Sequence, residues 1–258
     1  MNVNEISFFI TLLYIICPFI YFKFAKDENW RAQIYKSLRY MSLLFTLFLL
    51  FIVLGVFLSG GILLYFYPSE HWPLALFLLC LGFFHLSEFF LVAAFNPDQL
   101  DESSLLLNMR DYNTALVSAV VEYVVEYNFF PSLRPPPYIA MGAAVVVVIG
   151  QAIRTTAVYT AKKAFTHYIQ ETKRSGHQLV TDGIYSFSRH PGYMGWFYWF
   201  VGTQVLLFNP VCFVIYLVVA FMFFKARIAY EEVTLLEMFG TDYAEYKKKV
   251  WTGIPFIA

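Results

Sequence analysis

The sequence predicts an all-α fold, a polytopic integral membrane helical bundle of about seven spans. Of the 258 residues, 59% are hydrophobic and 14% are charged, whereas about a quarter of the residues of soluble domains are charged. Lysine plus arginine and aspartate plus glutamate number 18 each, so the net charge gives no indication of a nucleic-acid partner.

Seven apolar runs are long enough to be spans. A helix needs about 20 apolar residues to cross the hydrocarbon core. The runs are residues 6–24, 41–67, 73–95, 113–130, 138–161, 193–208 and 211–224. Gly60 and Gly61 can bend or end the long second run, which we count as one span. Only Asn209 and Pro210 separate the last two runs, so these runs are expected to form a tight helical hairpin.

The basic residues indicate how the spans are oriented. They gather in the first loop (Lys23, Lys26, Arg31, Lys36, Arg39), in the loop before the hairpin (Lys162, Lys163, Lys173, Arg174, Arg189) and in the tail (Lys225, Arg227, residues 247–249). Seven spans put these three segments on one side of the membrane, which the positive-inside rule makes the cytosolic side. We therefore expect a lumenal amino terminus, a cytosolic carboxyl terminus and a first run that is retained as an anchor.

Several ionisable or polar residues lie inside the predicted spans. They are His85, Glu88, Glu122, Glu126, Gln151 and Arg154. Charged groups in lipid are costly, so these side chains must face the interior of the bundle. One interpretation is a proton relay. The other, which we favour, is structural: Arg154 pairs with a glutamate, and His85 bonds a backbone carbonyl across helices.

The cysteines suggest neither a disulfide nor a metal site. Cys17, Cys80 and Cys212 all lie in apolar runs, where a thiol behaves as a small hydrophobic group. No CxxC pair or Cys/His cluster with the spacing of a zinc site accompanies them.

The polar loop at residues 170–190 is a candidate ligand-binding segment. Gly176, Gly183 and Gly192 allow a ligand to approach the backbone closely. The alternative is a solvated connector. We favour binding, because aromatic and polar residues alternate through "HQLVTDGIYSFSRHPGY" and a mere linker does not need so many rings.

The segment after the hairpin is predicted to leave the membrane as a helix. Arg227 and Glu231 share one face of it through their spacing of four, and the helix should stop at Gly240, before a second short helix. The simplest account of the pair is a surface salt bridge, which would contribute only about 0.5 kcal/mol.

These motifs resemble one enzyme family. The strings "RHPGYMGWFYW", "EEVTLLEMFGTDYAEYKKKV" and "GIPF", with "HLSEF" and a following "NP" upstream, resemble the isoprenylcysteine carboxyl methyltransferases. The resemblance covers the whole chain and is most specific at residues 170–256. The amino-terminal part has one span fewer than the eight expected of mammalian members. The resemblance implies methylation of the carboxyl-terminal carboxylate of prenylated cysteine in CaaX-processed proteins, at the endoplasmic reticulum membrane, with the active site facing the cytosol.

The resemblance also implies a set of site residues. The residues that would hold S-adenosylmethionine are Gln170, His177, Gln178, Leu179, Val180, Tyr185, His190, Pro191, Gly192, Tyr193 and Glu231. Arg227 would bind the substrate carboxylate, and Arg227 and Glu231 are the candidate catalytic residues. No G-x-G-x-x-G follows a strand, so a Rossmann domain is not expected. The expected partners are farnesylated or geranylgeranylated protein carboxyl termini and the bilayer, with no metal and no nucleic acid.

The predicted organisation is a single domain, residues 1–258. Residues 1–165 are mainly the transmembrane bundle, and residues 166–258 are the cofactor and catalytic region, including the hairpin 193–226. Because a free α-carboxyl group has a pKa of about 3.5, the acceptor is already ionised at neutral pH and needs no general base. The prenyl chain would enter from the bilayer beside the aromatic residues 196–200, and this role is compatible with a second interpretation of these rings, an interfacial belt.

The sequence is also consistent with three other functions. A phospholipid methyltransferase and an NADPH-dependent sterol reductase have related carboxyl-terminal architecture. A non-catalytic transporter or receptor would use the buried glutamates, but the sequence shows no inverted repeat or pair of broken helices.

Overall fold

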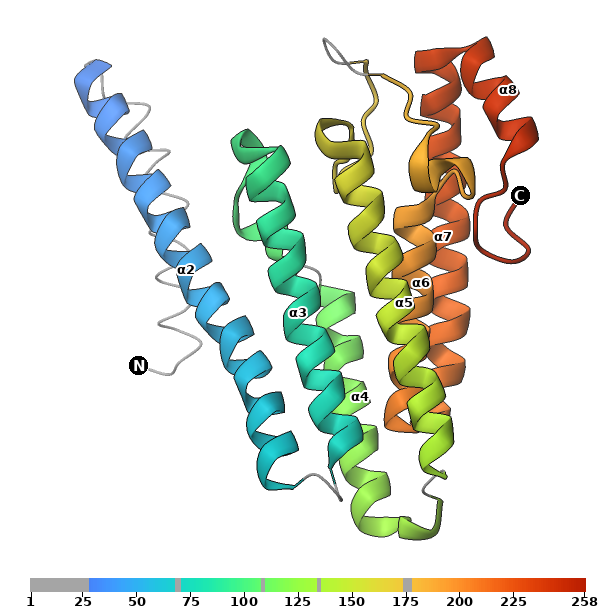
Figure 1. Ribbon diagram of the computed structural model, residues 1–258. Helices are drawn as coiled ribbons and strands as arrows, with labels where there is room; N and C mark the ends of the chain where they lie inside the picture. The colour runs from blue at the N-terminus through green and yellow to red at the C-terminus, as the bar shows by residue number, and fades with distance from the viewer. Residues whose placement is uncertain (1–27, 68–70, 108–109, 134–135, 174–177) are drawn as a thin grey trace. The chain divides into compact units, whose positions relative to one another are not determined.

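The computed structural model describes residues 28–67, 71–107, 110–133, 136–173 and 178–258, and their regular structure is entirely helical. The predicted span 6–24 lies outside these residues. The α-helices are α2 (Glu28–Phe66), α3 (Trp72–Phe95), α4 (Arg110–Phe129), α5 (Pro137–Ala161), α6 (Pro191–Leu207), α7 (Pro210–Phe239) and α8 (Thr241–Lys249) (Figure 1). Short 3₁₀ helices are η1 (Pro97–Gln99), η2 (Glu102–Leu105), η3 (Pro131–Leu133), η4 (Lys162–Ala164) and η5 (Gly183–Ser186).

The described helices confirm the predicted all-α membrane fold. Four of them contain segments long and apolar enough to cross a bilayer, namely Ser42–Phe66, Trp72–Phe95, Pro137–Ala164 and Pro210–Phe239. The helices α4 and α6 do not meet that criterion, α6 because it has only 17 residues. The count of seven spans therefore stays a prediction. The run 41–67 belongs to one continuous helix, so Gly60 and Gly61 do not end it.

The chain divides into two compact units, Met1–Phe48 and Leu49–Ala258, and the division falls inside α2. The predicted single-domain organisation thus stays a prediction. The second unit contains every described residue of the predicted site.

Glycines bring α5 and α6 into backbone contact. A Cβ atom on Gly150 would lie 2.8 Å from the carbonyl oxygen of Gly195, and one on Gly195 would lie 2.6 Å from the backbone nitrogen of Arg154. Small residues allow this close approach between membrane helices. The contact places Arg154 beside the start of α6.

The aromatic segment 196–200 packs inside the bundle. Trp199 is 1% exposed and stacks on Phe84 with ring centroids 4.7 Å apart, and Phe197 is also buried. Residues of an interfacial belt would face outward, so that interpretation of these two rings is wrong.

The predicted hairpin is present between α6 and α7. Phe208 adopts a left-handed conformation with φ of 60° at the end of α6, and Asn209 and Pro210 complete the turn. The carboxylate of Glu122 accepts hydrogen bonds of 2.7 Å from the backbone amides of Val211 and Cys212. These amides begin α7 and have no partner within it, so Glu122 on α4 caps the helix.

The ionisable residues of the spans make the structural contacts that we favoured. Both carboxylate oxygens of Glu88 on α3 accept hydrogen bonds from Arg154 on α5, each 2.9 Å long. Nδ1 of His85 donates to the carbonyl oxygen of Leu105 over 2.6 Å. The glutamate that pairs with Arg154 is thus the one from the "HLSEF" motif.

The end of α7 and the presence of a short helix after it are as predicted. The helix α7 continues without a break from the hairpin to Phe239 and stops at Gly240, whose φ of 55° favours glycine. The short helix α8 follows and leads to a carboxyl-terminal tail.

Candidate functional site

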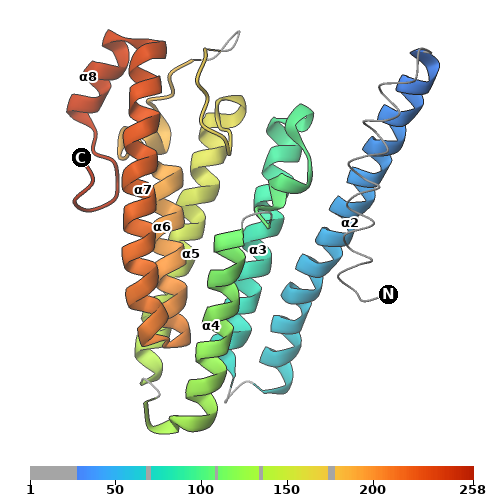
Figure 2. The ribbon, with the colours of Figure 1, turned by 180° about the vertical axis from the view of Figure 1, so that it is seen from behind.

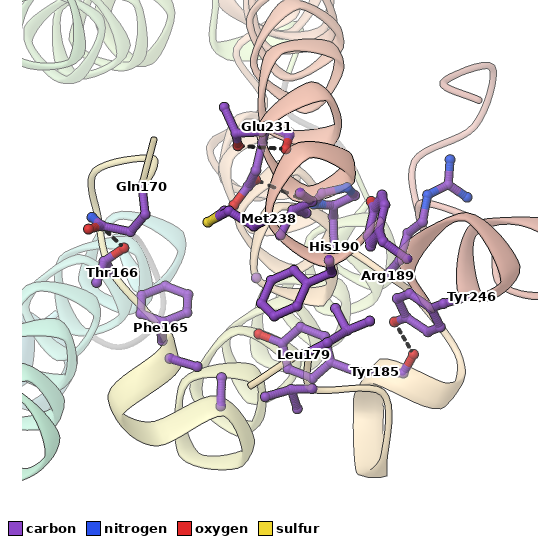
Figure 3. Close-up of a pocket in the computed structure, with 18 of the residues that line it drawn as sticks. Phe165, Thr166, Gln170, Leu179, Tyr185, Arg189, His190, Glu231, Met238 and Tyr246 are labelled. Carbon is purple, nitrogen blue, oxygen red and sulfur yellow. Dashed lines mark hydrogen bonds and ion pairs between the residues drawn. The ribbon is translucent and has the colours of Figure 1, made fainter. Parts of the chain in front are cut away.

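One cavity collects most of the predicted site residues. It encloses about 840 Å³, part of it open to solvent, between the loop after α5, the start of α6 and the carboxyl-terminal half of α7 (Figure 3). Ten predicted residues line it: Gln170, Gln178, Leu179, Val180, Tyr185, His190, Pro191, Gly192, Tyr193 and Glu231. The eleventh, His177, lies outside the described residues. The cavity combines apolar, aromatic and ionisable side chains, as ligand sites commonly do.

The remaining lining residues were missed in the sequence. They are Ala161, Ala164, Phe165, Thr166, Arg189, Thr234, Leu235, Met238, Phe239, Tyr243 and Tyr246. Helical spacing could have found some of them, because residues three, four, seven and eight positions after Glu231 share its face of α7. Nothing in the sequence indicated that Phe165 would lie opposite α8.

Aromatic rings form much of the cavity wall. The hydroxyl of Tyr246 on α8 donates to the carbonyl oxygen of Tyr185 over 2.6 Å, and this bond joins the loop to α8 (Figure 3). Burial raises the pKa of both Tyr185 and Tyr246, so both phenols are neutral. Neutral rings of this kind can stack on the base of a nucleoside.

His190 bridges two carboxylates at the floor of the cavity. Its Nδ1 lies 3.5 Å from Oε2 of Glu231, and its Nε2 lies 3.3 Å from Oε1 of Glu232. The ring stacks on Tyr193 with centroids 5.6 Å apart. Burial lowers the pKa of His190, but the hydrogen bonds to Glu231 and Glu232 outweigh it and the pKa is raised. The protonated imidazolium, in which both nitrogens donate, fits this position.

Glu232, which we did not predict, ties four segments together. It is 3% exposed and pairs with Arg189 and with Lys247 of α8, each over 2.5 Å. Arg189 also donates through its side chain and its backbone to the carbonyl oxygens of Val250 and Trp251. The carboxylate of Glu232 therefore links the turn before α6, the helix α7 and the helix α8, and Arg189 extends this network to the tail.

Glu231 presents a carboxylate to the cavity. Its Oε2 is buried in the cavity wall, and the cation nearest to it among the described residues is His190, whose Nδ1 lies 3.5 Å away. A carboxylate oxygen can accept more than one hydrogen bond. A ligand with a positive charge or a hydroxyl group could donate a second one.

Arg227 lies one turn of α7 before Glu231 and outside the cavity lining. Its Nε donates to the hydroxyl of Tyr193 over 2.9 Å, and its Nη2 donates to the carbonyl oxygen of His167 over 2.6 Å. Among the described residues Arg227 and Glu231 do not form an ion pair, so a surface salt bridge between them is the wrong interpretation. Two of the five N–H groups of the guanidinium make these bonds.

The buried pair of Glu88 and Arg154 connects to this site. His167 donates to Glu88 over 2.7 Å, and Arg154 donates to the carbonyl oxygen of Gly192 over 3.2 Å. The pair therefore holds both the Gly192 turn of the cavity and the segment whose carbonyl binds Arg227.

Comparison with known proteins identifies the family. The model of the isoprenylcysteine carboxyl methyltransferase family matches residues 142–237. A Xenopus laevis protein-S-isoprenylcysteine O-methyltransferase is 42% identical over 205 residues, which are 79% of this chain and 71% of the relative. The chain belongs to the isoprenylcysteine carboxyl methyltransferase family.

Further members of the isoprenylcysteine carboxyl methyltransferase family are similar over most of the chain. The Homo sapiens enzyme is 40% identical over 79% of this chain and 72% of its own length, and the Saccharomyces cerevisiae enzyme is 39% identical over 82% and 90%. A solved structure of the eukaryotic intramembrane Ras methyltransferase ICMT matches with a TM-score of 0.77 and 33% identity, covering 96% of this chain and 93% of that one. The chain is thus an integral membrane methyltransferase, as its motifs predicted.

Proposed function

We propose that this chain transfers a methyl group from S-adenosylmethionine to the α-carboxylate of a carboxyl-terminal prenylcysteine, as in CaaX-processed proteins. One observation supports this most directly. Glu231 and Arg227 lie one helical turn apart on α7, with Glu231 in the wall of the cavity and Arg227 outside that lining, toward the transmembrane part of the helix. An acidic group on the water side and a basic group nearer the lipid fit a cationic cofactor and an anionic, lipid-attached acceptor.

The cavity residues fit the cofactor. S-adenosylmethionine, when bound, supplies an electrophilic methyl group on a sulfonium and also carries an ammonium and an adenosine. The carboxylate of Glu231 complements the positive charge, and the rings of Phe165, Tyr185 and Tyr246 offer surfaces on which a base can stack. We propose that the other ten predicted cofactor residues, including His177, also hold S-adenosylmethionine.

Arg227 is the residue that we assign to the acceptor. Tyr193 and His167 hold its guanidinium in place, and its remaining N–H groups can bind a carboxylate through two parallel bonds. The acceptor is ionised at neutral pH because a free α-carboxyl group has a pKa of about 3.5. Positioning and the exclusion of water are therefore what the protein has to provide. The prenyl chain enters from the bilayer beside residues 196–200.

The test of this function is a choice among acceptors. Purified protein is incubated with methyl-labelled S-adenosylmethionine and farnesylcysteine, a phospholipid or a sterol. We expect a base-labile methyl ester on farnesylcysteine alone. Label on the phospholipid would make the protein a phospholipid methyltransferase, and turnover of the sterol with NADPH would make it a reductase.

We place the protein in the endoplasmic reticulum membrane with the site facing the cytosol. Tags at the two ends, probed with protease in sealed microsomes, are expected to show a cleaved carboxyl-terminal tag and a protected amino-terminal tag. We expect this result because the basic clusters mark the cytosolic side and an odd number of spans puts the two ends on opposite sides of the membrane. Equal protection of both tags would contradict a count of seven spans.

A variant in which Cys17, Cys80 and Cys212 are all alanine is expected to keep most of its methyltransferase activity. Cys80 and Cys212 lie on α3 and α7, outside the cavity lining, and their loss costs only packing. Initial rates at saturating cofactor, compared with the parent protein, provide the measurement. A folded variant that binds cofactor without turnover would require a thiol in the mechanism.

A further inference from the structure

The carboxyl-terminal tail, residues 251–258, returns along α7 after α8 has ended. Ile254 and Ile257 are buried in a cluster with Ala220, Phe224 and Ile228 of α7. Figures 1 and 2, seen from opposite sides, both show the tail beside the half of α7 that leads to α8. The tail therefore folds back toward the membrane.

Helix geometry gives the depth of the tail. Because an α-helix rises about 1.5 Å per residue, Ala220 and Ile228 lie roughly 15 and 27 Å from the start of α7 at Pro210. The hydrocarbon core of a bilayer is about 30 Å thick, and α7 is one of the helices that can cross it. With the start of α7 at one edge of the core, the tail packs against α7 between the middle of the core and its other boundary with water.

The tail has a defined turn. The carbonyl oxygen of Thr252 accepts a 2.6 Å hydrogen bond from Ser188, and the hydroxyl of Thr252 donates to Ile257 over 2.6 Å. Gly253 has a φ of 97°, and a Cβ there would lie 2.5 Å from the sulfur of Met194. These contacts fix which side chains of the tail point outward.

Two aromatic rings point away from the protein. Phe256 is 95% exposed and adopts a φ of 63°, which is unusual for a residue other than glycine, and Trp251 is 55% exposed. Lys247, Lys248 and Lys249 precede them in the last turn of α8. Outward aromatic rings at the membrane boundary, next to a basic cluster, are typical of segments that bind lipid.

We infer that the tail is an interfacial membrane anchor, in which the ring of Phe256 enters the acyl region and Trp251 lies at the level of the headgroups. The depth at which Ile254 and Ile257 dock selects lipid over a protein partner as the occupant. The anchor also reaches the candidate site, because Trp251 and Thr252 bond Arg189 and Ser188 through their carbonyl oxygens.

The experiment measures the depth of residue 256 directly. The cysteine-free variant with Phe256→Cys is labelled with a nitroxide and reconstituted in nanodiscs of phosphatidylcholine and phosphatidylserine, an anionic lipid of the cytosolic leaflet. Collisions with oxygen, which concentrates in lipid, and with a water-soluble nickel chelate are then compared by electron paramagnetic resonance. The matched controls are Val214→Cys on the exposed face of α7 and Glu245→Cys on α8, whose parent side chains are 58% and 59% exposed.

Oxygen-dominated collisions at residue 256, as at Val214→Cys, are the expected result. Nickel-dominated collisions, as at Glu245→Cys, would overturn the inference, and so would low accessibility to both reagents, which would indicate a protein contact. A second variant tests the inference without a label, in case the nitroxide disturbs the tail. Phe256→Gly removes the ring and also relieves the positive φ, which by itself would raise the melting temperature. We expect the loss of the ring's contact with lipid to outweigh this relief and to lower the melting temperature in nanodiscs, whereas a higher one would show that the ring makes no favourable contact with lipid.

Discussion

Replacing Arg227 with lysine is expected to raise the KM for a prenylcysteine acceptor at least about tenfold, the factor that corresponds to 1.4 kcal/mol, and to leave the Kd of the cofactor nearly unchanged. Lysine keeps the charge but loses the planar fork that can bond Tyr193, His167 and a carboxylate at the same time. Steady-state kinetics in prenylcysteine measure the first quantity, and calorimetric titration of S-adenosylmethionine measures the second.

Glu231→Gln is expected to have the opposite effect: it should weaken cofactor binding rather than raise the KM for prenylcysteine. The change keeps the size of the side chain and removes the negative charge that faces the cavity and His190. The loss of a charged hydrogen bond costs about 1.5 to 3 kcal/mol, roughly a ten- to hundredfold weaker affinity for S-adenosylmethionine. The KM for prenylcysteine at saturating cofactor should change much less.

Exposed residues of the same helix provide the controls. Lys225→Gln and Glu237→Gln change charge on α7 at exposed positions outside the cavity lining, and both should behave like the parent. If Arg227→Lys and Glu231→Gln also bound cofactor and used prenylcysteine like the parent, the assignment of α7 to the active site would fail.

Breaking the buried pair of Glu88 and Arg154 is expected to destabilise the protein severely. Glu88 is 1% exposed and Arg154 is 2% exposed, and removal of one partner leaves the other charge buried and unpaired. Such a loss costs about 3 to 5 kcal/mol. Glu88→Leu and Arg154→Met should each lower the melting temperature of the purified protein by many degrees, as measured by size-exclusion chromatography after heating.

The double variant separates electrostatics from packing. With both charges removed, no buried ion is left unpaired, so we expect Glu88→Leu with Arg154→Met to melt at a higher temperature than either single variant. Activity should remain low, because the pair also holds His167 and Gly192 at the site. Phe90→Leu, two residues away at an exposed position of α3, is the control and should be nearly silent. A double variant less stable than both single ones would contradict the pairing.

The local features of the chain could be read from the sequence. Apolar runs set the helices because lipid leaves the backbone no other hydrogen-bonding partners. Prolines near the starts of α3, α5, α6 and α7 and Gly240 after α7 set helix boundaries, because these residues act on their own backbone. The family motifs in turn indicated ten residues that line one cavity.

Only the tertiary structure decided which distant groups meet. The cost of a charge in lipid indicates that Glu88 and Glu122 face inward, but it does not show that Glu88 pairs with Arg154 while Glu122 caps α7. The same holds for Glu232, whose partners lie 43 and 15 residues away in the chain. These contacts depend on which helix faces pack together, and here backbone contact at glycines such as Gly150 brings Arg154 to the turn before α6. Sequence spacing describes one helix at a time, whereas the site is made where several helices and the tail converge.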